Sequence, residues 1–188
     1  MNYFEDKTIR NLVAKDKNLD KGEYENCIFE NSDLSNSDLS EIVFSDCTFK
    51  VCNLSLATLK KSAFRNVKFR DCKMLGLHFE ECNQFGLELE FESCILNHTS
   101  FFNIKINNAN FKNSTLIETD FTECILTKSI FENCNLSGAK FENTNLEHSD
   151  FRTSFSYKID PEINLVSKAK FSFPGILGLL HKYDIHIE

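Results

Sequence analysis

The sequence predicts a repeat fold, a solenoid with one short segment per unit, on two observations. Phe or Leu recurs every five residues from Phe111 to Phe151, and a small residue stands two places before each of them. A period of five fits neither an amphipathic helix, which repeats near 3.6, nor a half-buried strand, which repeats at 2. Such fixed self-similarity is typical of repeat architectures.

Composition and length are consistent with one globular unit. The chain has 188 residues and a net charge of -7, and no stretch resembles a linker between domains. Its longest strongly apolar run, Ile176 to Leu180, is too short to cross a bilayer. The charged N-terminus lacks the apolar stretch of a secretory signal. We therefore expect a cytoplasmic protein without a membrane contact.

The first 18 residues fit the repeat poorly, because Asn2, Lys7 and Lys17 stand where small residues are due. We expect residues 1–18 to form an irregular cap that covers the exposed end of the first coil. From Leu19 the period holds, and residues 19–155 are predicted to be the repeat region.

The large-residue position of the repeat supplies the predicted core. Each side chain buried there should contribute about 1.5–3 kcal/mol. Most of the 19 Phe residues occupy this position: Phe29, Phe44, Phe49, Phe64, Phe69, Phe79, Phe91, Phe101, Phe111, Phe121, Phe131, Phe141 and Phe151. Asn recurs at one outward position, which indicates turns at the corners of the coils.

The eight cysteines all fall in the small-residue column. A cysteine there alternates with Ser, Thr and Ala, and we interpret it as a small buried hydrophobe. A disulfide between adjacent coils under oxidation is the alternative. No cysteine or histidine spacing of a metal site occurs, and no cofactor or catalytic motif is found, so we expect neither a metal nor a cofactor nor an enzyme.

The period slips by two residues between Phe79 and Phe91, within residues 83–90. We predict a bulge or a small projecting loop that includes Gln84 and Phe85, with Gly86 as its turn residue. A neutral insertion and a functional loop are both compatible with this pattern.

The composition changes in residues 156–188, where we expect a helical C-terminal cap. The segment Asp160–Pro161–Glu162 predicts a helix start, and Ser172–Pro174 predicts a second one. The last residues, 184–188, alternate as a short strand would. The tail carries more apolar surface than an end cap needs, which favours a homodimer interface over a simple cap. The interface set is Phe171, Phe173, Ile176, Leu177, Leu179, Leu180, Tyr183, Ile185 and Ile187.

These columns resemble those of pentapeptide repeat proteins over nearly the whole chain. The resemblance implies an all-β fold, a right-handed quadrilateral β-helix with a short α-helical C-terminal cap. The segment from Ile159 to Asn164 and the apolar tail resemble a subgroup that includes Qnr-type quinolone-resistance proteins and the microcin B17 immunity protein. In that subgroup the tail joins two rods, and the acidic rod imitates a DNA duplex that binds DNA gyrase or topoisomerase IV. The large projecting loops of the Qnr proteins have no counterpart here beyond the slip.

Charges along the chain suggest which residues such a partner would contact. Acidic residues prevail from Asp16 to Asp46, basic ones from Lys50 to Lys73, and acidic ones again from Glu88 onward. The predicted partner-binding acids lie near the tail: Glu118, Asp120, Glu123, Glu132, Glu142, Glu147 and Asp150. Solubility alone would also account for them. The basic band lacks exposed aromatics, so we expect no direct nucleic-acid binding.

Three functions remain open on the sequence. The first is a DNA-mimicking modulator of a type II topoisomerase that gives resistance or immunity to inhibitors or toxins. The second is a protein-interaction scaffold without a link to topoisomerases. The weakest is an enzyme that uses an outward acidic cluster.

Overall fold

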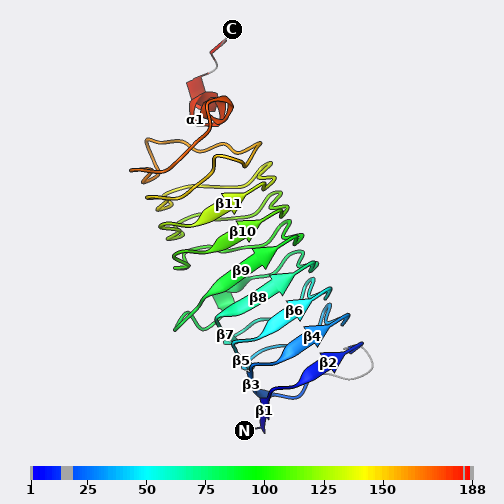
Figure 1. Cartoon of the computed structure of the whole chain (residues 1–188). Helices are drawn as coiled ribbons and strands as arrows, with labels where there is room; N and C mark the ends of the chain where they lie inside the picture. Colours follow the sequence, from blue (N-terminus) through cyan, green and yellow to red (C-terminus); the bar gives the residue numbers. More distant parts are fainter. Residues whose placement is uncertain (1, 14–18, 184, 187–188) are drawn as a thin grey trace.

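The structure, a computed structural model, describes residues 2–13, 19–183 and 185–186. The chain winds into a parallel β-solenoid whose coils stack along one axis, with the C-terminal tail at one end (Figure 1). This is the predicted quadrilateral β-helix.

Two parallel sheets form two of the four sides. The seven-stranded sheet has the order β11-β10-β9-β8-β6-β4-β2, and the four-stranded sheet has the order β1-β3-β5-β7. The strands are β1 (Asn2–Glu5), β2 (Thr8–Arg10), β3 (Gly22–Glu25), β4 (Ile28–Glu30), β5 (Val43–Ser45), β6 (Thr48–Lys50), β7 (Ala63–Arg65), β8 (Val67–Arg70), β9 (Leu89–Glu92), β10 (Asn110–Lys112) and β11 (Ile130–Glu132). Isolated parallel bridges such as Thr115↔Asn135 and Ser100↔Asp120 hold the other two sides.

The corners explain the outward Asn residues. The residue two places after each large one has a positive φ, near +50° to +60°, as at Asn26, Asn31, Asn103 and Asn133. Asn tolerates this left-handed conformation better than other side chains that carry a Cβ. The predicted turn chemistry is confirmed.

The large column forms the core as predicted. The Phe121 ring is fully buried and stacks on Phe101 and Phe141, with centroid distances of 5.2 Å and 5.1 Å. It also meets Phe111 and Phe131 edge-on, each at 5.9 Å. Stacked and edge-to-face contacts are the arrangements that aromatic pairs prefer. All eight cysteines are buried and free, which confirms their structural interpretation.

The first residues do not form the irregular cap that we predicted. Strands β1 and β2 pair in register with β3 and β4, so residues 2–13 make an ordinary coil despite the polar residues in its small column. Lys7 is exposed there, since a polar side chain is tolerated where no coil precedes it. Residues 14–18 lie outside the described part of the chain.

The predicted helix after Asp160 is wrong, and the solenoid continues past Phe155. Residues Leu165 and Lys170 form parallel bridges with Asn145 and Asp150. The cause is Asn164, which is buried in the small column. Its Nδ2 donates to the Phe141 carbonyl (2.8 Å) and its Oδ1 accepts from the Thr144 amide (2.8 Å), so the side chain satisfies backbone groups of the preceding coil.

Helical structure is confined to two places. A single 3-10 turn, η1 (Phe79–Glu81), precedes the slip. In the tail, η2 (Pro174–Ile176), α1 (Leu177–Leu180) and η3 (His181–Tyr183) follow one another. The second predicted helix start, at Ser172–Pro174, is therefore confirmed. The predicted terminal strand falls mostly outside the described residues, which exclude 184, 187 and 188.

Candidate functional site

The outward side chains lie on four faces, which we number in chain order. The first face is the seven-stranded sheet, and the fourth contains the four-stranded sheet. The second follows the bridges from Asp33 to Phe155, and the third follows those through Asp38 and through Asp120 to Lys140. Each coil contributes one pentapeptide to every face, so each face runs the length of the rod.

Charges on the first face neutralise one another between coils. Glu30 Oε2 lies 2.8 Å from Arg10 Nε, and Glu30 Oε1 lies 3.6 Å from Lys50 Nζ. Glu92 lies in the same way between Arg70 (3.5 Å) and Lys112 (4.0 Å). Much of the basic band of the sequence is therefore paired with acids of the neighbouring coils.

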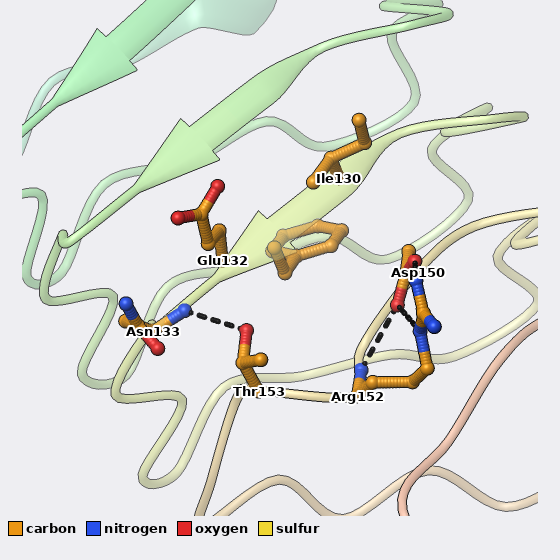
Figure 2. Close-up of a pocket in the computed structure, with 7 residues that line it drawn as sticks. Ile130, Glu132, Asn133, Asp150, Arg152 and Thr153 are labelled. Atoms are coloured by element: carbon orange, nitrogen blue, oxygen red, sulfur yellow. Dashed lines mark hydrogen bonds and ion pairs between the residues drawn. The ribbon is translucent and has the colours of Figure 1, made fainter.

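The same face has a shallow hollow of about 500 Å³ at its C-terminal end, shown in Figure 2. Two of the predicted partner-binding acids, Glu132 and Asp150, line it. Arg152 Nη2 lies 2.7 Å from Asp150 Oδ2, and this contact holds the pKa of the Asp150 carboxyl below its usual range. Asp150 therefore stays ionised but has its own counter-ion.

The third face collects acidic side chains. Its described bases are Lys21, Lys60, Lys61 and Lys140. Its acids, all at least partly exposed, are more numerous and run from end to end: Asp20, Asp38, Glu41, Glu80, Glu81, Asp120, Glu123, Glu142, Asp160 and Glu162. An acidic face of this length gives the rod a directional negative field.

The structure thus brings together only part of the predicted acidic set. Asp120, Glu123 and Glu142 share the third face, whereas Glu118 lies at the edge of the second and Glu147 on the fourth. Sequence reasoning missed the acids of the N-terminal half of the third face. Reading the sequence in steps of twenty residues, with the two-residue slip subtracted, would have aligned them.

The slip forms a small turn on the fourth face. Strands before it pair at a spacing of 20 residues, and Val67↔Leu89 pairs at 22, so the two extra residues lie between Asn83 and Leu89. Gly86 has φ +72°, which confirms it as the turn residue. Phe85 is 79% exposed, and Gln84 and Gly86 border a hollow of about 350 Å³ that reaches Lys105.

The tail is fixed to the last coil by a polar contact that the sequence did not reveal. Lys182 Nζ lies 2.8 Å from Asp160 Oδ1 and 2.6 Å from Glu162 Oε2. The Tyr183 hydroxyl donates to Glu162 at 2.7 Å. Hydrogen bonds from Lys182 keep the pKa of both carboxyls below their usual values. The carboxylates of the Asp160–Pro161–Glu162 segment therefore anchor the tail.

The predicted interface residues of the tail differ in exposure. Phe171 and Leu179 are partly buried against the core, and Leu180 is also partly buried. The more exposed members are Phe173 (88%), Leu177, Tyr183, Ile185 and Ile176. Ile187 lies outside the described residues.

Neither a metal site nor a membrane span is found in the described part of the chain. Among these residues, no group of three or more His, Cys, Asp or Glu side chains could hold a metal ion. The helices that the structure describes are all too short to cross a bilayer.

A family comparison decides the family. The sequence profile described as "Pentapeptide repeat region" matches residues 23–87 and 78–151. The chain belongs to the pentapeptide repeat family. A comparison with curated protein sequences found no significant match.

Solved structures share the fold over the full length of this pentapeptide repeat protein. A trypsin-treated variant of QnrB1, described as a plasmid-mediated fluoroquinolone resistance protein, aligns with a TM-score of 0.68 at 17% identity and covers 100% of both chains. A second trypsin-treated variant aligns at 0.64, with 18% identity over 99% of this chain and 98% of that one. Full-length QnrB1 aligns at 0.56, with 17% identity over 98% and 100%.

Proposed function

We propose that this pentapeptide repeat protein is a non-enzymatic rod that binds DNA gyrase or topoisomerase IV by imitating a DNA duplex. Binding would reduce the action of an inhibitor or a toxin on that enzyme. The observation that carries the proposal is the match to QnrB1 from end to end, with the tail included. The subgroup resemblance of the tail supports the same partner.

The third face is the surface that fits this role. A protein that grips a DNA duplex uses basic groups directed at the phosphates. An acidic face that runs along a rod can meet the same groups, while the first face, with its compensated charges, cannot do so as well. We therefore assign Asp120, Glu123 and Glu142 to the contact surface, and the enzyme's cytoplasmic DNA is the competitor.

Two copies would join through the tail. The exposed apolar residues of the tail continue the rod axis, so a homodimer about this end would double the length of the acidic face. Light scattering tests this step, since Leu180→Asp should yield a monomer. A wild-type protein that is itself monomeric would remove the dimer from the proposal.

A gyrase supercoiling assay tests the function. The purified protein is titrated into the reaction with and without a quinolone, and we expect either inhibition or protection at micromolar protein. Neither effect on gyrase or topoisomerase IV would leave the scaffold function, in which the same rod presents its side chains to another protein.

A further inference from the structure

The chain does not fill a hollow between its last coil and its tail. This tail hollow measures about 300 Å³, at the lower end of sites that enclose small ligands, about 300–1,000 Å³. None of its lining residues carries a charge. They are Ser154, Phe155, Ser156, Tyr157, Ser172, Pro174, Gly175, Leu177 and Gly178.

The floor of the tail hollow is Tyr157. Its side chain is 4% exposed, and its hydroxyl is buried with no hydrogen-bond partner among the described residues. A Cβ at Gly175 would lie 2.0 Å from this hydroxyl, and one at Gly178 would lie 2.4 Å from the Tyr157 carbonyl oxygen. The two glycines therefore let the tail approach Tyr157 closely and still leave the hollow open.

A large apolar side chain stands beside the tail hollow without a contact of its own. Phe173 lies between the lining residues Ser172 and Pro174, and it is 88% exposed. The rim residues Phe155 (52%) and Leu177 (54%) are also half exposed. An exposed ring next to an apolar rim indicates a surface that is covered in the working protein.

We propose that the Phe173 ring of each copy enters the tail hollow of the other copy in a homodimer. The inference rests on the dimer of the proposed function and names the contact that completes it. Each protomer offers one ring and one hollow side by side, as a two-fold interface requires. The occupant is a second copy, because two acidic rods can meet without opposed charges only at an uncharged surface of this kind.

Cross-linking tests the contact directly. Phe173→Cys chains and Leu177→Cys chains that differ in a size tag are mixed, exchanged and oxidised with diamide. We expect a tagged-to-untagged disulfide within minutes, at least tenfold more than in a mixture of Phe85→Cys and Leu177→Cys chains. The native thiols are buried and should not interfere.

The outcomes separate the contact from the dimer. A dimer by light scattering that gives no more cross-link than the control overturns this inference and leaves the proposed dimer intact. A monomeric wild type overturns both. Phe173→Ala provides a second measurement, with an expected rise of at least tenfold in the dimer dissociation constant and an unchanged Tm. The matched variant Phe85→Ala, at another exposed Phe, should leave both values unchanged.

Discussion

Lys182 Nζ lies 2.8 Å from Asp160 Oδ1 and so ties the last helical turns of the chain to the last coil of the solenoid. The neighbouring Glu162 holds the same ammonium group. One lysine therefore sets the orientation of the whole apolar tail.

We predict that Lys182→Ala loosens the tail without unfolding the rod. The Ile159 amide donates to the Gly178 carbonyl (3.0 Å), so its hydrogen exchange reports whether the tail is docked. Exchange at Ile159 should be faster in the variant, while exchange in β10 stays the same. The exposed Lys158 provides the control, and equal protection in Lys182→Ala and Lys158→Ala would contradict the anchoring role. Because Lys182 lowers the pKa of both carboxyls, docking should also weaken as pH falls below about 4.

The phenylalanine stack should not tolerate a charge. Phe121→Asp would place a carboxylate among four aromatic rings, and we expect the loss of cooperative thermal unfolding. Phe121→Ala should cost about 3–5 kcal/mol of unfolding free energy. Phe102 is 41% exposed, so Phe102→Asp should melt close to the wild type. Calorimetry that finds both Asp variants alike would contradict the core assignment.

One corner residue is poorly suited to its backbone conformation. Val51 has φ +54° and is 56% exposed. A β-branched residue in this region is strained, by about 1–3 kcal/mol. Val51→Asn should therefore raise the unfolding free energy by about 1 kcal/mol in a denaturant titration. Val43→Asn, in strand β5, should lower it instead. A Val51→Asn protein that is less stable than the wild type would refute the strain.

The buried thiols make the protein sensitive to alkali. Burial raises the pKa of Cys47 and Cys124 to about 12 and that of Cys134 to about 11. Unfolded thiols ionise near pH 8.5, so the unfolded state gains relative stability above that pH. We expect the unfolding free energy to fall from about pH 8.5 through the folded pKa values, and the native thiols to resist iodoacetamide at pH 7. Rapid labelling of the folded protein would contradict their burial.

Much of the fold could be read from the sequence because a five-residue period is visible locally. The Phe121 column, the buried cysteines and the turn at Gly86 all follow from that period. The period also misled at both ends. Pro161 followed by Glu162 is a good helix start in isolation, but the Asn164 amide, bonded to Phe141 and Thr144 of the coil before, keeps the segment in the solenoid.

The candidate site was less accessible to sequence reasoning. Neighbours on one face are 20 residues apart, or 22 across the slip, so counts of charge along the chain mix four faces. Lys182 and Asp160 are 22 residues apart, and no local pattern marks their contact. Long-range ion pairs of this kind depend on where the tail folds back.

Direct binding to DNA gyrase, measured with two matched triple variants, tests the central claim. The first variant neutralises the third face (Asp120→Asn, Glu123→Gln, Glu142→Gln). The second removes the same charge from the other faces (Glu118→Gln, Glu132→Gln, Glu147→Gln). We predict that the wild type binds, that duplex DNA displaces it, and that rising salt weakens it. The third-face variant should lose about tenfold or more in affinity and the other variant about twofold at most. A wild type that does not bind, or equal losses in both variants, would contradict the account.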